Sequence, residues 1–543
     1  MSTTAVRPIV ADRAAEGETV TGAGTLFRFA LRRERFTLPF WLLGAAALLA
    51  FQSVGSQNFY DTPQKLAQLR QTMSASAATV AMGGPTKLLD TIGGEVLFEI
   101  FAYLVIVAGL MNMFLVGRHT RSDEETGRAE LIRSARVGRR APTVAALGVA
   151  AVADVALALT LFAAAVATGL PAAGSVLTGV AVAGAGFTFA AVTAVAAQLF
   201  ENPRSVYGSV TLTLAAAYVV RAIGDVGPDA VAWASPFGWG QRTYPYVSDR
   251  WWPLLLFALA SAVLVGVACV VLDRRDFGAG LFGYGTGRAR ASWALRAPLG
   301  LALRLQRGSL FAWTAGVFTL GGAYGAFADS IEDYLRDYPE LSAYFPGGAE
   351  SAVNSYLALT LSMMALLAAA YGIVSTLRAR GEETAGRAEL ILSAPVSRSR
   401  WLAGQLVVAL AGSAVVLAAG GVGIGLSYAL TVADPGQIAR TTGSAVVYLP
   451  AVWVVIAGTA LAFGWFPRAS LPAAWTVFAY CVVGVMFANS FDLPGWFDDA
   501  SPFAHTPRAP WEPVTAAPII ALLLVAALLA GGALTGFRRR DLG

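Results

Sequence analysis

Stretches of about 20 mainly apolar residues recur along almost the whole chain, and this feature limits its fold more than any other. A bilayer core is about 30 Å thick, so a helix needs roughly 20 apolar residues to cross it. Only 13% of the residues are charged and the mean hydropathy is +0.60, whereas a soluble globular protein carries about 25% charged residues. The sequence therefore predicts a polytopic membrane protein.

We expect twelve of these stretches to cross the membrane, and each of them to be a helix because every backbone amide in lipid must bond within its own segment. The predicted spans lie near 37–56, 96–116, 143–168, 174–199, 206–224, 251–272, 308–328, 353–377, 402–430, 443–466, 470–488 and 515–536.

Arginines gather in alternate connections between these spans, and the remaining connections are acidic or mixed. The basic connections include residues 28–35, 118–140, 274–307, 378–400 and 538–540. The positive-inside rule then places both termini in the cytoplasm. Residues 1–23 contain no apolar signal-peptide core and are expected to form a disordered cytoplasmic tail. Because the net charge of +5 is spread over many short clusters, it does not indicate a nucleic-acid partner.

The outer connections contain further features. A proline at the first helical position predicts a helix that starts at Thr62-Pro63 within residues 57–95. Residues 225–250 and 489–514 are rich in aromatic residues and proline, which suits either short interfacial or re-entrant segments or ordinary aromatic anchoring. Asp154 is an acid well inside a span. Arg221, Glu95, Glu99 and Asn354 lie near outer span ends, where snorkelling or a function would explain them equally well.

A tandem duplication is the strongest internal signal. The segment RSDEETGRAELIRSARVGR starts at Arg121, and RGEETAGRAELILSAPVSR starts at Arg380; they align without gaps and agree at 12 of 19 positions. The sequence Arg-Arg-Asp also recurs after the sixth span of each half, at 274–276 and 539–541. We therefore expect two six-helix halves of the same orientation, at residues 24–283 and 284–543.

The repeated motif has the chemistry of a docking element. If it is helical, Glu124 lies one turn before Arg128, and Glu383 one turn before Arg387, in the favoured order for an ion pair. Ala129, Leu131 and Ile132, with their repeats, would add an apolar face to a short amphipathic helix with surface charges. A solvated charged loop is the plainer alternative. The candidate docking residues are Asp123, Glu124, Gly127, Arg128, Glu130, Glu382, Glu383, Gly386, Arg387 and Glu389.

The sequence contains no motif for binding ATP. A P-loop needs a lysine after glycine, but Lys65 follows glutamine and Lys87 follows threonine. We therefore expect no catalytic, cofactor-binding or metal-binding residue in this chain. Its energy source would be a separate ATPase subunit, which would bind ATP and Mg²⁺, or an ion gradient.

At this motif the chain resembles the fused two-half ABC-2-type (type V exporter) permeases of actinobacterial tetronasin- and narasin-type antibiotic-resistance and multidrug exporters. The resemblance is carried by EETGRAELI at 124–132, EETAGRAELILSAPVSRSRW at 382–401 and the amphipathic TLFRFALRRERF at 25–36. It covers nearly the whole chain. It implies an all-α membrane protein of twelve helices in two parallel six-helix ABC-2-type repeats.

The resemblance also implies that each motif is a coupling helix for a nucleotide-binding subunit. Two copies of a separate ABC ATPase would energise export of hydrophobic antibiotics and drugs across the bacterial cytoplasmic membrane. The two copies of the motif differ where Arg133, Arg136 and Gly138 stand in place of Leu392, Pro395 and Ser397. The two docking contacts are therefore expected to be unequal in strength, with the second copy the more important.

A proton-coupled drug transporter of the major facilitator type is the alternative. Such carriers also have twelve spans in two parallel halves, and Glu124-Glu125-Thr126-Gly127-Arg128 loosely fits their acid-x-x-Gly-Arg motif. The following Ala-Glu-Leu-Ile and the long connection 57–95 fit that class poorly. Proton-coupled carriers also tend to place acids at mid-membrane, and the second half has no counterpart of Asp154.

Overall fold

A computed structural model describes residues 19–75, 77–276, 278–281, 290, 292, 295, 297–328, 352–487 and 499–541. This described part is helical with connecting turns and contains no β-strand, which confirms the predicted all-α class. The chain divides into two compact units, Met1–Thr286 and Gly287–Gly543. Most of the predicted tail lies outside the described residues. Its last part is ordered, since Thr19 and Thr21 accept hydrogen bonds from the amides of Arg140 and Gly138.

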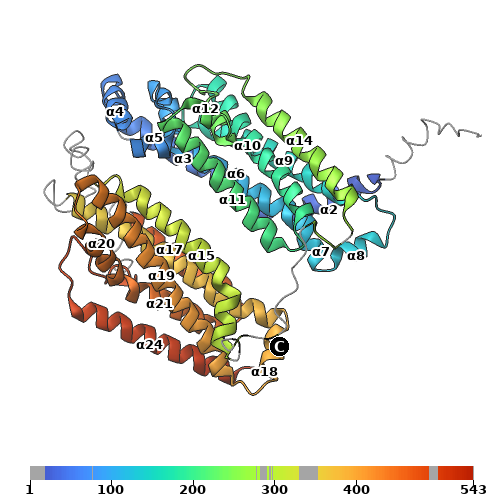
Figure 1. Ribbon diagram of the computed structural model, residues 1–543. Helices are drawn as coiled ribbons and strands as arrows, with labels where there is room; N and C mark the ends of the chain where they lie inside the picture. Colours follow the sequence, from blue (N-terminus) through green and yellow to red (C-terminus); the bar gives the residue numbers. More distant parts are fainter. Residues whose placement is uncertain are drawn as a thin grey trace, which may run out of the picture. The chain divides into compact units, whose positions relative to one another are not determined.

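Unit 1 is a bundle of long helices with short helices at both of its ends (Figure 1). The long helices are α3 (Thr37–Phe59), α6 (Ile92–Gly117), α9 (Ala141–Ala167), α10 (Ala172–Leu199), α11 (Pro203–Val226) and α14 (Leu254–Arg274). One end carries α2 (Ala23–Glu34), the π-helical turn η2 (Arg118–Ser122), α7 (Asp123–Glu125) and α8 (Arg128–Arg133). The other carries α4 (Pro63–Ala75), α5 (Ala77–Gly83), η1 (Thr86–Asp90), α12 (Asp229–Ala232) and α13 (Pro236–Gln241).

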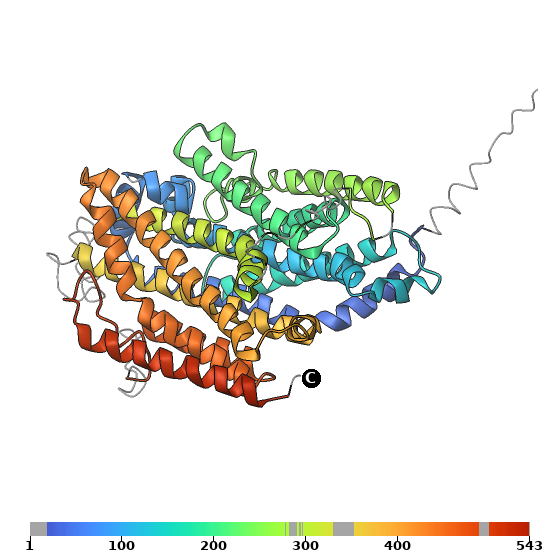
Figure 2. The same cartoon turned by 60° about the horizontal axis from the view of Figure 1, so that its bottom comes forward.

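Unit 2 repeats this plan over the residues that the structure describes. Its helices are α15 (Pro298–Gly325), α17 (Ala352–Thr384), α18 (Arg387–Leu392), α19 (Arg398–Val432), α20 (Gly436–Val447), α21 (Leu449–Trp465), α22 (Ser470–Phe487) and α24 (Ala516–Arg539). In both views α24 runs beside α21, and α18 lies at the end of the unit that also holds residue 541 (Figures 1 and 2).

All twelve predicted spans fall in these helices, but not all of the helices meet the length and composition of a span. Within the described ranges, ten helices are long and apolar enough to cross a membrane. The other two are α15, which contains most of the predicted span 308–328, and α22, which contains most of 470–488. The polytopic membrane fold is therefore confirmed, and the count of twelve spans stays a prediction.

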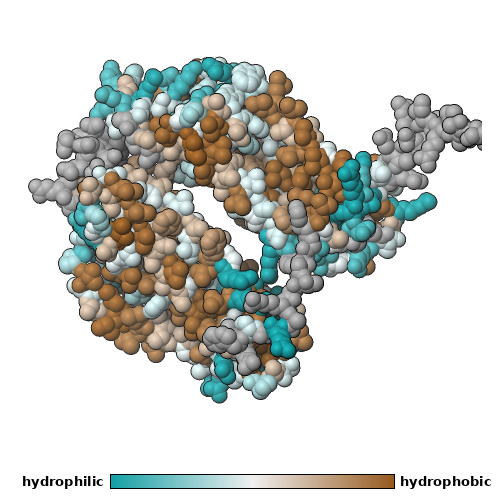
Figure 3. Space-filling model, in the orientation of Figure 1, coloured by the Kyte–Doolittle hydropathy of each residue, from teal (hydrophilic) through white to brown (hydrophobic). Residues whose placement is uncertain are grey.

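The most buried of the candidate spans is α6 in unit 1 and α17 in unit 2. In α6 and α17, 72% of the most apolar window is buried inside the protein, against 17% in α3, α14 and α24. Small residues allow close approach of the helices around this core: a Cβ on Gly321 would lie 2.5 Å from the carbonyl oxygen of Gly420. Figure 3 shows hydrophobic residues over the sides of the helices and hydrophilic residues towards the ends of each unit.

The connections after the first and fifth long helices of unit 1 are structured. Helix α4 begins at Pro63, as the sequence predicts. Residues 225–250 form α12, α13 and turns, and Phe237 packs edge-on against Phe189 and Tyr218 in the core. That ring is therefore part of the unit's core and not an interfacial anchor. Of the matching segment 489–514, residues 489–498 lie outside the described residues.

Candidate coupling site in each unit

The chain changes direction at a glycine in each copy of the motif. Gly127 and Gly386 have φ angles of 73° and 69°, in the left-handed region that favours glycine. Their amides donate to the carbonyls of Glu124 and Glu383, at 3.2 and 2.9 Å, and a new short helix starts at the next residue. The acid and the arginine of the predicted pairs consequently lie on different helices. The predicted one-turn pairs Glu124–Arg128 and Glu383–Arg387 are therefore wrong.

Each motif arginine instead reaches back across the glycine to the first acid of its copy. Nη1 of Arg128 lies 3.5 Å from Oδ1 of Asp123, and Nε of Arg387 lies 2.7 Å from Oε2 of Glu382. Both acids are buried, while both arginines are exposed. Each pair joins the residues before the reversing glycine to those after it. This use of Asp123 and Glu382 was not predicted.

The second acid of each copy binds the arginine that follows the sixth long helix of the same unit. Glu124 accepts hydrogen bonds from Arg275 at 2.5 Å and from Arg121 at 2.6 Å. Glu383 accepts two from Arg540, at 2.7 and 2.6 Å. The expectation that these acids lie on a free surface is wrong, because their side chains are only 15% and 14% exposed.

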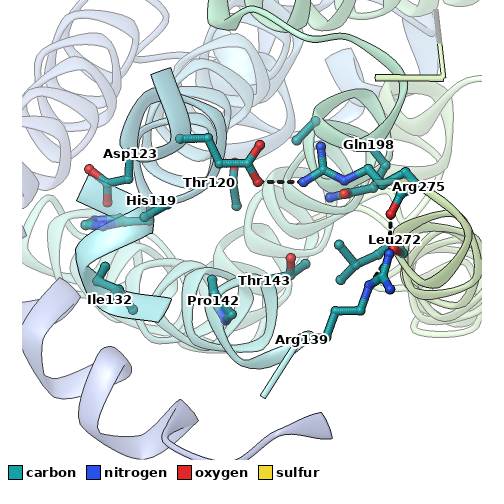
Figure 4. Close-up of a pocket in the computed structure, with 13 residues that line it drawn as sticks. His119, Thr120, Asp123, Ile132, Arg139, Pro142, Thr143, Gln198, Leu272 and Arg275 are labelled. Carbon is teal, nitrogen blue, oxygen red and sulfur yellow. Dashed lines mark hydrogen bonds and ion pairs between the residues drawn. The ribbon is translucent and has the colours of Figure 1, made fainter. Parts of the chain in front are cut away.

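A further arginine of the motif fixes the same helix end through the backbone. Arg139 donates to the carbonyls of Leu272 and Arg275, and its repeat Arg398 donates to that of Arg540 at 2.7 Å. Figure 4 shows Arg139 and Arg275 beside one another in the cavity beneath α8. We call the motif glutamate and these two arginines the clamp of each unit: Glu124, Arg139 and Arg275 in unit 1, and Glu383, Arg398 and Arg540 in unit 2.

The arginines of the clamp were missed as site residues. The repeated Arg-Arg-Asp sequence and the arginine that ends the aligned motif were the available signals, but nothing in the sequence pairs them with the motif glutamate.

The apolar residues of the motif do not form one outward face. Ala129 and Ile132 line the cavity beneath α8, and Ala388 is buried against the cluster that contains Trp401 and Phe537. Leu131 and Leu390, however, are each 76% exposed. Glu130 and Glu389, one residue earlier, are exposed as well. Each copy thus presents the same outward group of an arginine, a glutamate and a leucine, Arg128-Glu130-Leu131 and Arg387-Glu389-Leu390, which we call the tip.

Helix α2 is joined to the first motif by ion pairs. Arg33 donates to Asp123 at 2.8 Å, and Glu34 accepts from Arg118 at 3.0 Å and lies 2.9 Å from Nε2 of His119. Burial favours a higher pKa for Glu34, but the hydrogen bond with His119 and the charge of Arg118 outweigh it and lower the pKa. These contacts therefore join the first motif to the segment before the first span.

The isolated polar residues of the spans have different surroundings. Asp154 is buried and accepts a hydrogen bond from Asn112 at 2.8 Å. Arg221 is also fully buried, pairs with Asp225 at 3.2 Å, and lies over the ring of Tyr218 at 4.5 Å. Snorkelling is therefore wrong for Arg221, because a carboxylate one helical turn away neutralises it inside the unit.

The helices and their apolar surfaces define a polytopic helical membrane protein. Residues 24–272 and 295–538 match the family described as multidrug efflux system permease Rv1217c, C-terminal domain. The chain is also 39% identical over 532 residues to the multidrug efflux system permease protein Rv1217c of Mycobacterium tuberculosis (strain ATCC 25618 / H37Rv), covering 97% of this chain and 96% of that protein. The chain belongs to this family of permeases, which confirms the resemblance found in the motifs.

Proposed function

We propose that this chain is the permease subunit of an ATP-driven ABC exporter in the bacterial cytoplasmic membrane, with both termini in the cytoplasm. A separate ABC ATPase would bind ATP and Mg²⁺, and two copies of it would dock on the two motifs. Hydrophobic antibiotics and drugs would be the substrates, in keeping with the multidrug efflux named in the description of its relative.

The recurrence of one tip on one clamp in both units carries this proposal. A loop that only provides positive charge does not need a leucine 76% exposed to solvent, at the same position twice. It also does not need a glutamate and two arginines to fix the base of that tip. Such a tip, with an exposed leucine next to a glutamate and one turn from an arginine, has the features of a contact with a protein partner.

The proposal is tested with the full chain and a candidate ABC ATPase from the same organism. The purified chain alone should not hydrolyse ATP, whereas the co-expressed pair should copurify and hydrolyse ATP faster when a drug is added. Native mass spectrometry should give one permease and two ATPase chains. ATP hydrolysis by the permease alone would contradict the proposal. Drug transport driven by a proton gradient without any ATPase would instead support the facilitator alternative.

A further inference from the structure

Two acids lie one helical turn apart near the start of α6, within a candidate membrane span. Glu95 is fully buried, and neither of its carboxylate oxygens has a hydrogen-bond partner. Glu99 is exposed on the side of the unit. Its carboxylate accepts a hydrogen bond of 2.7 Å from Gln52 of the neighbouring helix α3, and the same amide nitrogen donates to Ser56 at 3.1 Å.

No positive charge of the described residues neutralises this pair. The polar side chains close to the Glu95 carboxyl are those of Glu99 and Ser56, and those close to the Glu99 carboxyl are Gln52 and Glu95. Asp225, by contrast, pairs with both Arg221 and Arg242. When both are ionised, two carboxylates one turn apart repel each other strongly at low dielectric constant, so the pair must hold either a proton or another cation. A cation bound at the exposed side of the pair would remove that repulsion.

The surface next to Glu99 is aromatic and apolar. Tyr103 lies one turn further along the same side of α6 and is 47% exposed, and Phe51 precedes Gln52 in α3 and is 67% exposed. Aromatic faces attract cations and also bind apolar groups. A ligand that fits this surface carries a positive charge within an apolar body.

The site lies far from the motif and occurs in one unit. Glu99 and Arg118 are nineteen residues apart on a helical path, or about 28 Å. In the register of the motif, Asn354 and Ala358 of α17 replace Glu95 and Glu99. Asn354 accepts a hydrogen bond of 2.6 Å from Arg440, so an arginine is bound where unit 1 leaves its acids without a cation.

We propose that Glu95, Glu99 and Gln52 bind the charged group of lipophilic cations, and that such cations are one substrate class of this permease. The binding follows from the unit itself, and only the role as a substrate rests on the proposed function. Acids within membrane spans commonly mark the path of a charged substrate. Here Glu99 would contact the cation, Glu95 would add negative potential from behind it, and Gln52 would orient the Glu99 carboxylate.

The test uses the full chain in lipid nanodiscs without any ATPase, and measures binding of tetraphenylphosphonium by equilibrium dialysis. Triphenylphosphine oxide, which is apolar and uncharged, is the ligand control. Glu99→Gln should weaken tetraphenylphosphonium binding about tenfold or more, and the double variant with Glu95→Gln further. Glu99→Asp should keep most of the binding, and Asp434→Asn, which changes an exposed acid outside the site, should keep all of it.

Equal affinity of wild type and the double variant for tetraphenylphosphonium would overturn the proposal. An equal loss of both ligands in Glu99→Gln would also overturn it, because it would show a general change of the apolar surface. Because no ATPase is present in this measurement, an absence of tetraphenylphosphonium binding would not contradict the proposed ATP-driven permease. Conversely, a chain that does not bind an ATPase could still bind the cation, so that result would not contradict the cation site.

Discussion

Arg540 donates one hydrogen bond from each of its terminal nitrogens to the two carboxylate oxygens of Glu383, at 2.7 and 2.6 Å. Its guanidinium also lies 4.9 Å from the ring centres of both Phe463 and Phe537. Arg275 and Glu124 form the equivalent contact in unit 1. The acid three residues before the reversing glycine therefore serves the fold of its own unit. The role proposed for the tip, contact with a partner, rests instead on its exposed glutamate and leucine.

We expect Arg540→Ala to destabilise the chain, because it leaves the largely buried Glu383 carboxylate without its cation and removes two ring contacts. The loss should be about 1–3 kcal/mol, seen as a lower melting temperature of the purified chain in nanodiscs. Arg539→Ala is the matched control, since that neighbouring side chain is exposed. An equal melting temperature for Arg540→Ala and wild type would contradict the clamp.

The exposed leucines of the tips should matter for the partner and not for the fold. We expect the double variant Leu131→Asp and Leu390→Asp to change stability by less than about 0.5 kcal/mol, as exposed positions usually do. Copurification of the ATPase should be lost. Leu159→Ala, at an exposed position of α9 remote from the motif in sequence, should leave copurification intact. If the ATPase still copurified fully with the double variant, the tips would not be part of the docking surface.

Replacing the reversing glycines tests backbone conformation alone. A Cβ at Gly127 or Gly386 meets nothing within 4 Å, so alanine there costs only the left-handed conformation. We expect each replacement to destabilise the chain by about 1–2 kcal/mol. Gly381, within helix α17, also has open space. Gly381→Ala should therefore leave stability unchanged or raise it, and thermal unfolding of the three variants measures the difference.

Acid should weaken the link between α2 and the first motif. The pKa of Glu34 is lowered in the folded protein below its ordinary value of 4.5, so its contribution is present above the unfolded pKa and is lost as pH falls through the folded one. We expect the melting temperature of wild type to fall more between pH 6 and pH 3 than that of Glu34→Gln, with both measured in the same nanodiscs. Identical pH profiles would show that Glu34 contributes nothing.

The apolar periodicity of the sequence was sufficient to predict the long helices, because lipid permits few other structures for such segments. α9 and α10, for example, begin and end within two residues of the predicted spans. The number of spans is harder to predict. Helix α15 carries Arg304 and Arg307 near its start, so its length and composition do not decide whether it crosses the membrane.

The site was harder to predict, because its contacts join residues far apart in the chain. Glu383 and Arg540 are separated by 157 positions, and no local pattern pairs them. Gly127 could have been read as a helix end, yet glycine also occurs inside helices, as Gly381 does. For Arg221 the sequence left snorkelling and a function open, although Asp225 stands one turn later on the same helix and a buried pair was a further local possibility.

Two identical subunits related by a two-fold axis must carry the same residues at equivalent places. In a duplicated and fused chain the two halves can carry different residues at equivalent places. Here Asn354 and Ala358 stand in the second half where the first has Glu95 and Glu99. The tip, which meets two copies of one partner in the proposed complex, has kept the same three residues in both halves. The acidic pair has not, so saturation with cation should occur at one equivalent per chain, where a symmetric pair of half-size subunits would take two.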